Sequence, residues 1–335
     1  MNINLIHTNN KFIEGINKYG MDLLNGLRIN NINVNSVLIK KYEIKVNNKK
    51  YGGWISREIS EKFINLPINE VNHSIDHWNI VKATNIITIH DIIPYYYSDE
   101  YKLSNIALKY YEKAFNKIGH IEFIIVLSRH VYNTLYEKAN KYIEGALVYV
   151  IPRGVNKYLN VGLISPYPDD NKIHLITVGD FNKRKRFDLL YEYVKDLKDV
   201  HLYHIGKVSD IESYERAMRN INNNVSYLGY IPDSTIMHTY IKFAHKFVYN
   251  TLDEGQGMPS LEAMRLGTQP VVNNIEVHKE ILGVLPYYYN NKDEFVEQIY
   301  KPNNDSSILS NYVSKYDDWI SKHISAYEDV WNQIK

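Results

Sequence analysis

The sequence predicts an α/β fold in which two domains, each with a parallel sheet, follow one another along the chain. Three observations support this prediction. Short β-rich runs alternate with stretches of helical periodicity almost from end to end, the pattern expected when helices connect parallel strands. A chain of 335 residues is too long for one ordinary core. A weakly patterned stretch at residues 156–171, which contains Pro166 and Pro168, divides the pattern into two sets.

The elements follow from hydrophobic periodicity. In the first half, strands are expected at residues 3–7, 34–39, 86–90, 123–127 and 147–151, and helices at 15–28, 103–118 and 130–139. In the second half, strands are expected at residues 173–178, 201–205, 225–228, 246–249 and 270–272, and helices at 187–197, 211–221, 233–243, 259–266 and 292–300. Residues 317–334 carry apolar side chains at helical spacing and are expected to form an amphipathic helix docked on a core. Acidic residues interleave with that apolar stripe, which disfavours a membrane anchor.

The composition is that of a globular protein, with 44% hydrophobic and 23% charged residues. A net charge of +1 argues against broad binding of polyanions such as nucleic acid. The absence of cysteine excludes disulfides and thiolate chemistry. No apolar run reaches the ~20 residues needed to span a bilayer, and the first residues read as a strand rather than a signal peptide. The expected location is therefore the cytoplasm, with the cytoplasmic face of a membrane as the alternative.

Two glutamates, Glu254 and Glu262, stand eight residues apart between the strands expected at 246–249 and 270–272. Gly255 and Gly257 allow a ligand to approach the main chain closely, and Pro259 suits a first helical turn. The amides of Gly257, Met258 and Ser260 would then point out of a helix N-terminus, where the dipole favours an anion. Carboxylates accept hydrogen bonds from sugar hydroxyls. The whole string therefore indicates a site for a phosphate-bearing, hydroxyl-rich ligand rather than a helix cap with two solvated glutamates.

This string resembles the E-x7-E signature of family-4 retaining glycosyltransferases. Glu254 and Glu262 match the two glutamates of the signature, whereas Gln256 and Met258 replace its usual Phe and Leu. The resemblance implies a GT-B fold, with two Rossmann-like domains whose parallel sheets face one another across a cleft. The expected boundaries are an acceptor-side domain at 1–155, a linker at 156–171, a nucleotide-sugar domain at 172–316, and a helix at 317–335 that crosses back to the first domain.

A basic loop follows the strand expected at 173–178, and it resembles the V-G-R-L-x-x-R-K-N loop of the same family. Gly179 matches the glycine of that loop, and Arg184 and Lys185 match its basic pair. Such cations can clamp a diphosphate, because Arg makes forked contacts and Lys acts as a point charge. Asp180 stands where the family often has Arg. A solvated basic loop and a nucleic-acid patch are the weaker readings.

Two further segments resemble the parts of the family that border the nucleotide base. They contain Gly206, at the end of a strand, and the pair Tyr230 and Ile231. Backbone groups there are expected to read the edge of the base.

In the first half, Gly15 lies in a segment similar to the G-I-G-R-Y turn of many family-4 enzymes. His90 and Asp91 lie in a segment similar to T-x-H-D-L-I-P, where they could orient an acceptor hydroxyl and share a proton. The family also places a histidine under the donor sugar, and either His73 or His77 could fill that role. Their His-x-x-x-His spacing invites a metal site, but the sequence offers no third ligand nearby, so no metal is expected.

The resemblance implies retaining, metal-independent transfer of a hexose from a UDP- or GDP-sugar to an acceptor hydroxyl. In this hypothesis Arg184 and Lys185 hold the diphosphate, Glu254 binds the donor sugar and Glu262 the ribose. No cofactor is expected besides the donor substrate. The sequence leaves open whether the acceptor is a glycan, a lipid-linked glycan or a protein. It also leaves open peripheral membrane association and the oligomeric state. Residues 40–61 match no segment of the family, and we expect them to bind the acceptor or to vary. The alternatives are a catalytically inactive sugar-nucleotide-binding protein and a GT-B sugar-nucleotide epimerase; nucleic-acid binding is the weakest.

Overall fold

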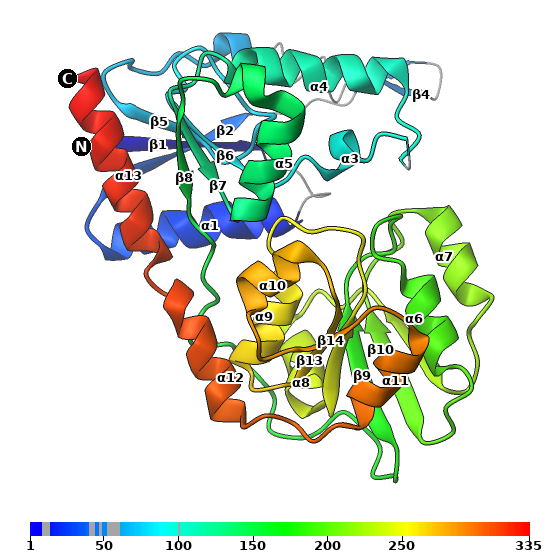
Figure 1. Cartoon of the computed structure of the whole chain (residues 1–335). Coiled ribbons are helices and arrows are strands. Elements are labelled where there is room, and N and C mark those ends of the chain that lie inside the picture. The colour runs from blue at the N-terminus through cyan, green and yellow to red at the C-terminus, as the bar shows by residue number, and fades with distance from the viewer. Residues whose placement is uncertain (9–13, 40–43, 47–48, 52–60, 100) are drawn as a thin grey trace. The chain divides into compact units, whose positions relative to one another are not determined.

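The computed structural model describes residues 1–8, 14–39, 44–46, 49–51, 61–99 and 101–335 (Figure 1). The chain forms two compact units. The first unit comprises Met1–Arg153 together with Asp318–Lys335, and the second comprises Gly154–Asp317. Each unit contains one six-stranded parallel sheet with helices around it, which confirms the predicted α/β class.

The sheet of the first unit has the strand order β2-β1-β5-β6-β7-β8, and every neighbouring pair is parallel. Its strands are β1 (Asn2–Thr8), β2 (Asn33–Ile39), β5 (Val71–Ser74), β6 (Ile86–Ile89), β7 (Phe123–Val126) and β8 (Leu147–Val150). The apolar runs do not predict β5, because three of its four residues are polar. A short antiparallel pair, β3 (Ile44–Val46) and β4 (Lys49–Tyr51), lies outside this sheet.

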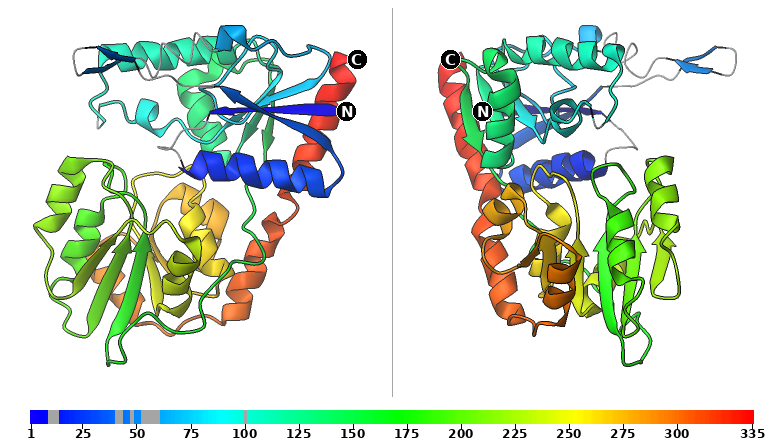
Figure 2. Two further views of the ribbon diagram at one scale, coloured as in Figure 1. Left: turned by 180° about the vertical axis from the view of Figure 1, so that it is seen from behind. Right: turned by 45° about the vertical axis from the view of Figure 1, so that its right-hand side comes forward.

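Helices cover both faces of this sheet, as the further views in Figure 2 make clear. They are α1 (Glu14–Ile29), α3 (Ile93–Tyr96), α4 (Asn105–Ile118), α5 (Arg129–Ala139) and α13 (Trp319–Ile334). Successive side chains of β7 alternate between the two faces. Phe123 and Ile125 pack in the core with α1 and α13, whereas Ile124 and Val126 pack in the core with α4 and α5.

The last helix, α13, belongs to the first unit although it comes at the end of the chain. It packs on α1 and β5. Gly26 of α1 makes the close approach feasible, because a Cβ there would lie 2.5 Å from Cδ1 of Ile320. No helix in the described part of the chain is long and apolar enough to cross a bilayer.

The sheet of the second unit has the order β11-β10-β9-β12-β13-β14, again parallel throughout. Its strands are β9 (Ile173–Val178), β10 (Val200–Ile205), β11 (Val225–Gly229), β12 (Lys246–Tyr249), β13 (Pro270–Asn273) and β14 (Tyr287–Tyr289). Its helices are α6 (Phe187–Val194), α7 (Ile211–Met218), α8 (Ser234–Phe243), α9 (Met258–Arg265), α10 (Glu276–Leu282), α11 (Lys292–Tyr300) and α12 (Ser306–Val313). The sequence patterns do not predict β14 or α12.

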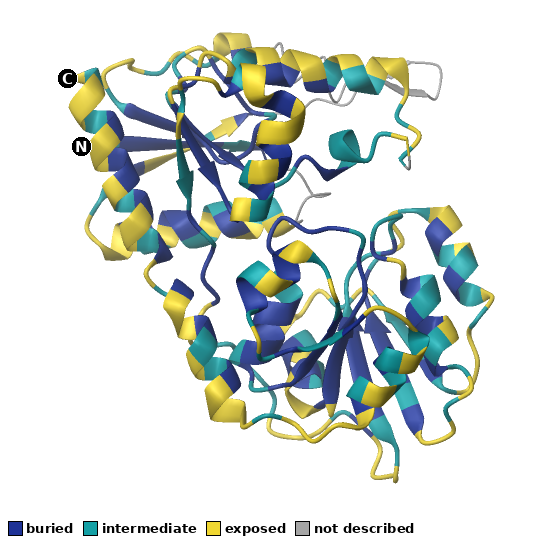
Figure 3. Cartoon of the chain, viewed as in Figure 1, coloured by how far each residue is buried: buried dark blue, intermediate teal, exposed yellow. Residues whose placement is uncertain are grey.

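The central strands of each sheet are buried on both faces, whereas the helices expose their outer sides (Figure 3). In β12, Phe247 and Tyr249 enter one core and Val248 enters the other. A strand that is buried on both faces requires a continuous apolar run. Most strands could therefore be predicted from the sequence. The loops after the carboxyl ends of the strands are the usual ligand sites of such sheets. Most of the motifs singled out in the sequence lie there, whereas His73 lies within β5 and Gly15 within α1.

Candidate functional site

Two loops of the second unit bring the predicted basic and acidic residues together. The loop after β9 carries Arg184 and Lys185, and the loop after β12 carries Glu254. The strands β9 and β12 are neighbours in the sheet, so their carboxyl ends lie side by side. The main chains of the two loops are also joined, since the amide of Leu252 donates to the carbonyl of Arg184 at 2.7 Å.

The carboxylate of Glu254 is the centre of this cluster. Nη1 of Arg184, Nζ of Lys185 and the hydroxyl of Tyr249 all contact its Oε1 atom. Burial by itself raises the pKa of Glu254, but the charges of Arg184 and Lys185 outweigh it and hold the pKa at about 2. Among the described residues, no hydrogen bond or ion pair reaches Oε2, so that oxygen keeps its capacity to accept hydrogen bonds.

Lys185 is the more deeply buried of the two cations. Burial lowers its pKa to about 8; the nearby charge of Arg184 lowers it as well, and Glu254 opposes both effects. Its Nζ also lies over the ring of Tyr249, 4.4 Å from the centroid, where a cation is stabilised. Arg184 exposes 21% of its side chain and donates from Nη1 to the carbonyl of Asp253 at 3.0 Å. Arg184 is therefore the cation that a ligand in solution reaches first.

The loop that presents Glu254 is held by hydrogen bonds to its own main chain. The amide of Glu254 donates to Oδ1 of Asp253 at 2.7 Å. Asn273, at the end of β13, accepts from the amide of Thr251 at 3.1 Å and donates to its carbonyl at 2.7 Å. Thr251 in turn donates from Oγ1 to the carbonyl of Asp253 at 2.9 Å. These bonds fix the position of the carboxylate without using its oxygens.

The glycine segment after Glu254 leads directly into α9. Gly257 is the N-cap residue of α9, has a φ of +80° and makes no side-chain capping bond. That backbone conformation favours glycine. Within the described residues, no hydrogen bond engages the amide of Gly257 or of Met258, and Pro259 has no amide hydrogen. The N-terminus of α9 therefore presents donors and a positive dipole end. Glu262 is buried within this helix, and Gln256 is buried just before it.

His278 of α10 is a neighbour of this segment that the sequence patterns do not single out. Its Nδ1 lies 2.9 Å from the carbonyl of Asn273 and must donate to it. Its Nε2 is therefore an acceptor; it is buried, and none of the described residues donates a hydrogen bond to it. A Cβ on Gly257 would lie 3.7 Å from that nitrogen. Burial lowers the pKa of His278 to about 4, so the ring is neutral at physiological pH.

The residues expected at the base-binding side lie at the ends of β10 and β11. Gly206 packs against the loop of Gly179 so closely that a Cβ on Gly206 would lie 1.9 Å from the Gly179 carbonyl oxygen. Tyr230 is 46% exposed, and Nζ of Lys207 lies 4.0 Å from the centroid of its ring. Ile231 packs against the apolar core beside it.

Asp180 has a structural role in this region. Its Oδ1 accepts the amide of Lys207 at 2.8 Å, and its Oδ2 accepts from Oγ of Ser209 at 3.3 Å. An Arg at this position, as in the family pattern, would donate hydrogen bonds and could accept none of these. Asp180 thus joins the loop after β9 to the loop after β10.

The remaining predicted site residues belong to the first unit. Gly15 is exposed in the first turn of α1, and its carbonyl accepts from Nη1 of Arg153 at 3.4 Å. Arg153 also pairs with Asp22 at 2.5 Å. His90 donates from Nε2 to the carbonyl of Ile75 at 2.9 Å. Burial lowers the pKa of His90 to about 4.

Asp91 is the acidic site residue that the sequence predicts in the first unit, and it lies after β6. Its Oδ1 accepts the amide of Ile93 at 3.2 Å. His77 is buried 3.6 Å from the carboxylate of Asp76. The described residues contain no group of three or more His, Asp or Glu side chains arranged to hold a metal ion.

His73 lies in the interior of the first unit, with no exposed surface. Both of its nitrogens are bonded within a chain of hydrogen bonds that ends on α13. Because the carbonyl of Trp319 can only accept, each donor along this chain is determined. The bonds run from Tyr327 to Nδ1 of His73 (2.7 Å), from Nε2 of His73 to Thr88 (2.8 Å), from Thr88 to Tyr19 (3.0 Å), from Tyr19 to Nε2 of His323 (2.7 Å), and from Nδ1 of His323 to Trp319 (2.8 Å). The chain of bonds ties α13 to the sheet.

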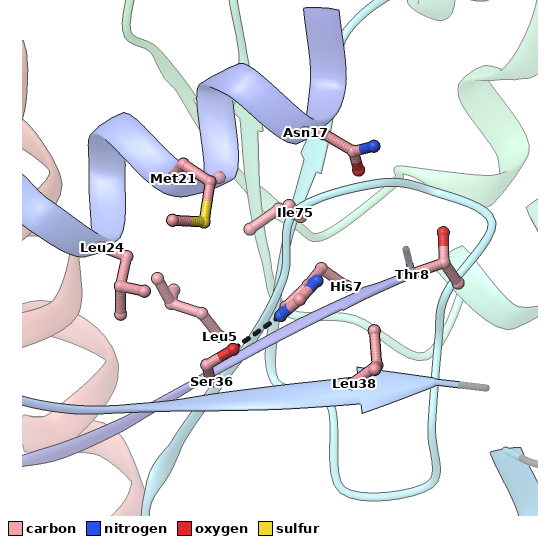
Figure 4. A pocket seen from close by; sticks show the side chains of 10 residues that line it. Leu5, His7, Thr8, Asn17, Met21, Leu24, Ser36, Leu38 and Ile75 are labelled. Carbon is pink, nitrogen blue, oxygen red and sulfur yellow. Dashed lines mark hydrogen bonds between the residues drawn. The ribbon is translucent and has the colours of Figure 1, made fainter. Parts of the chain in front are cut away.

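A pocket of about 290 Å³ opens between α1 and the ends of β1 and β2 in the first unit (Figure 4). Its walls are mostly aliphatic. Polar groups lie along one side, where Nε2 of His7 is 2.7 Å from Oγ of Ser36. Its lining residues are Leu5, His7, Thr8, Asn17, Gly20, Met21, Leu24, Ser36, Leu38 and Ile75. The sequence patterns do not predict this pocket, since its lining comes from four separate segments. Most of residues 40–61, which the sequence analysis assigns to acceptor binding or to local variation, lie outside the described residues.

Known proteins resemble this chain in sequence and in fold. Residues 165–316 match the family model described as "Glycosyl transferases group 1". The chain is 24% identical over 279 residues to the O-antigen chain mannosyltransferase RfbU of Salmonella typhimurium, covering 80% of this chain and 74% of that protein.

Two solved structures share the fold over nearly the whole chain. A sucrose-phosphate synthase from Thermosynechococcus elongatus superposes with a TM-score of 0.70 at 14% identity, over 99% of this chain and 98% of the other. WaaG, a glycosyltransferase involved in lipopolysaccharide biosynthesis, superposes with a TM-score of 0.65 at 12% identity, over the full length of both chains. Residues 165–316 therefore match the glycosyl transferases group 1 model, and the chain as a whole has the GT-B fold of these solved structures.

Proposed function

We propose that this chain transfers a hexose from a UDP- or GDP-sugar to an acceptor hydroxyl, with retention at the anomeric carbon and without a metal ion. The observation that carries the proposal is the cluster of Arg184, Lys185 and Glu254 in one pair of neighbouring loops, next to the open N-terminus of α9. Mannose is the first hexose to test, because the relative from Salmonella typhimurium is a mannosyltransferase.

The donor diphosphate would bind where cations and main-chain amides are closest together. Arg184 reaches solvent with part of its side chain, and Lys185 is held beside it by Glu254. The amides of Gly257 and Met258 add donors from the helix terminus, with Gly255 and Pro259 shaping the turn. These groups would stabilise the negative charge that grows on the diphosphate as the bond to the sugar breaks.

The two carboxylates would bind hydroxyls. Oε2 of Glu254 is the acceptor that remains after Oε1 has received its three internal donors, and we assign it to the donor sugar. We assign Glu262 to the ribose, and Gly179, Gly206, Tyr230 and Ile231 to the diphosphate and base side, with Gln256 near the sugar. His90 and Asp91 are proposed to orient the acceptor, and Gly15 to leave room for it.

The bonding and burial of His73 oppose a role under the donor sugar. Its nitrogens are occupied by Thr88 and Tyr327, and its side chain is closed to solvent. A contact with the donor sugar would require α13 to give up the hydrogen bond from Tyr327. The role under the sugar stays a prediction for His73 and for His77 alike.

The pocket beside α1 is proposed to hold part of the acceptor. It lies at the carboxyl ends of β1 and β2, where ligands of parallel sheets bind. Its mixed lining, aliphatic with the His7–Ser36 pair at one side, suits a group with both apolar and hydroxyl surface. Filling the pocket by Ser36→Leu, at an exposed lining position, is expected to raise the KM for the acceptor and leave donor binding unchanged.

The direct test is a transfer assay with labelled UDP- and GDP-hexoses, after a thermal-shift panel has identified the donor that raises the stability of the protein. Arg184→Ala with Lys185→Ala is expected to abolish transfer, since the diphosphate loses both cations. Lys183→Ala, a cation of the same loop, is the control and is expected to transfer normally. Full turnover by the double variant would reject the site. Donor binding without transfer to any acceptor would instead favour the inactive sugar-nucleotide-binding protein, and an isomerised donor would favour an epimerase.

A further inference from the structure

His278 carries a buried hydrogen-bond acceptor beside the proposed donor site. Its side chain is fully buried in α10. Nδ1 donates to the carbonyl of Asn273 at 2.9 Å, and no described residue donates to Nε2. Buried polar groups are nearly always hydrogen-bonded, because an unpaired one loses its bond to water and receives nothing in return. An acceptor of this kind therefore suits a donor group that a ligand brings.

The Nε2 atom faces the glycine segment that leads into α9. A Cβ built on Gly257 would lie 3.5 Å from Cδ2 and 3.7 Å from Nε2 of His278. Cδ2 and Nε2 are neighbours in the imidazole ring, so this edge of the ring is directed at Gly257. Gly257 is the N-cap residue of α9, whose N-terminus is the proposed place of the donor diphosphate. Nε2 is thus aimed at the segment that the donor is expected to contact.

The gap between this ring edge and Gly257 is slightly too small for a ligand atom. A Cβ bonded to Gly257 would fit there in ordinary van der Waals contact. An oxygen that is not bonded to Gly257 needs contact distance to the α carbon and hydrogen-bond distance to Nε2, so the gap has to widen by about 1 Å. Glycine allows such a move because its backbone has a wide range of conformations. A ligand hydroxyl therefore reaches Nε2 through a small shift of the glycine segment.

The chemistry of Nε2 limits which part of the donor it can bind. Burial lowers the pKa of His278 to about 4, so the ring is neutral at physiological pH and Nε2 carries a lone pair. Ionised phosphate oxygens are acceptors as well and offer it no hydrogen. A hydroxyl does offer one, and in a nucleotide sugar the hydroxyls belong to the hexose and the ribose.

The position of His278 favours the hexose over the ribose. Tyr249 connects His278 with Glu254, because its ring centroid is 6.1 Å from that of His278 and its hydroxyl donates to Oε1 of Glu254 at 3.1 Å. Asn273 connects them too: its carbonyl accepts from His278, and its side chain bonds the main chain of Thr251 in the loop of Glu254. The proposed function assigns Oε2 of Glu254 to the hexose. A second acceptor fixed to the same residues is therefore placed for another hydroxyl of that sugar.

We propose that His278 is a specificity-determining residue for the donor, and that its Nε2 accepts a hydrogen bond from one hydroxyl of the hexose. This inference rests on the proposed function and adds a residue to its donor site. Gly257 moves when the donor binds, and the hydroxyl exchanges its bond to water for a bond to Nε2. A donor that lacks this hydroxyl leaves the buried nitrogen unpaired and binds more weakly.

Two other groups could donate to Nε2, and they predict a different result. The amide of Gly257 could turn toward the ring as the segment moves, or a water molecule could bridge the two. In both cases the effect of removing the ring does not depend on which hydroxyls the sugar carries. Coupling between the ring of His278 and one particular hydroxyl is therefore the property that separates these possibilities.

The test is calorimetric titration of the full chain with UDP- and GDP-hexoses, mannose first, and with the monodeoxy analogues of the one that binds. The wild type is expected to bind one analogue about tenfold more weakly than the parent donor. His278→Phe removes the acceptor and keeps a ring. It is expected to bind the parent about tenfold more weakly and to bind that analogue and the parent equally well. His278→Gln, whose amide oxygen can take the place of Nε2, is expected to retain the preference.

His201→Phe is the matched control, because it makes the same change in the same unit. Nε2 of His201 lies 2.8 Å from Oγ of Ser226, near the start of β10 and so at the end of the sheet away from the donor loops. The control is expected to bind every donor like the wild type, and thermal unfolding shows whether each variant is folded. The inference is overturned if His278→Phe loses affinity for the parent and for all analogues by the same factor, or loses none.

A second measurement leaves the ring in place. The nitrogen resonance of Nε2 in isotopically labelled wild type, assigned by its absence from His278→Gln, is expected to shift when the parent donor is added. The analogue without the bonded hydroxyl is expected to shift it less. No shift with the parent overturns the inference even if His278→Phe does not fold. Transfer by the wild type without coupling at His278 keeps the proposed function and rejects this inference, whereas coupled binding without transfer does the reverse. If no UDP- or GDP-hexose binds, both are rejected.

Discussion

Nζ of Lys185 contacts Oε1 of Glu254, and these side chains expose only 7% and 8% of their surface. Two opposite charges are thus removed from water together, which is tolerable only while both are present. Nη1 of Arg184 contacts the same oxygen, so one carboxylate compensates two cations. The pair is therefore both the proposed donor site and a structural element of the second unit.

Replacing Glu254 by Gln is expected to destabilise the chain by about 3–5 kcal/mol, because the buried ammonium of Lys185 loses its counter-charge. The measurement is the free energy of unfolding in urea. Glu297→Gln is the control, since its ion pair with Lys301 at 2.9 Å is 64% exposed on the glutamate side and is expected to contribute less than about 1 kcal/mol. Similar losses for both variants would contradict the importance of burial.

His323 is one of the two histidines in the chain of hydrogen bonds that ends on α13, and it is expected to make the protein less stable in acid. Burial lowers the pKa of His323 to about 4 from its ordinary value of 6.5, so the unfolded chain binds a proton that the folded chain does not. Stability is therefore complete above about pH 6.5 and falls as pH drops toward 4, by about 1.4 kcal/mol per pH unit for one proton.

His323→Gln tests this prediction when unfolding is followed between pH 7 and about pH 4. The variant is expected to be less stable at pH 7, because Tyr19 loses its acceptor. The slope of its free energy of unfolding against pH is expected to correspond to the uptake of one proton fewer on unfolding. An unchanged slope in His323→Gln would mean that this ring is not the group that takes up the proton.

Gly206→Ala is expected to disrupt the second unit. The new Cβ would lie 1.9 Å from the carbonyl oxygen of Gly179, which is main chain and cannot swing aside. The two loops would have to separate, and the hydrogen bonds between them would be lost, at a cost above about 3 kcal/mol. Gly119→Ala is the control because the nearest atom to its Cβ would be 3.5 Å away and its φ is −58°. Thermal unfolding of both variants measures the difference.

Asp180 is expected to support the base side of the proposed donor site through Lys207. Asp180→Ala removes the acceptor for the Lys207 amide and is expected to weaken donor binding about tenfold, through a loop next to Tyr230. Asp180→Asn retains a side-chain oxygen and is expected to bind the donor nearly as well as the wild type. Calorimetric titration with the donor compares the two. If Asp180→Ala binds the donor with wild-type affinity, this loop is not part of the donor-binding site.

The order of strands and helices could be read from the sequence because both sheets are buried on two faces. A strand such as β12 must then be apolar at every position, as Lys246–Tyr249 nearly is. The strand β5 is not predicted for the opposite reason, since its polar residues Asn72 and His73 are buried and bonded by partners from other elements. Local pattern does not reveal a polar strand whose hydrogen-bond partners are distant.

The residue types and the loop of the candidate site could be predicted from the sequence, but the contacts among its side chains could not. The glycines, the proline and the two glutamates after β12 indicate a loop that leads into a helix N-terminus, because each of these residue types restricts the backbone locally. Arg184 and Lys185 share one oxygen of Glu254 because β9 pairs with β12. The spacing of residues along the chain does not predict that pairing.

The sequence by itself determined the α/β class, the positions of most elements and the residues of the glycine loop, because these depend on periodicity and on backbone preferences of neighbouring residues. Only the tertiary structure decided that His73 is bonded into the chain of hydrogen bonds that ends on α13, that Asp180 joins two loops, and that His278 lies beside Gly257. Each of these depends on contacts between segments far apart in the chain, and such contacts are set by how the elements pack.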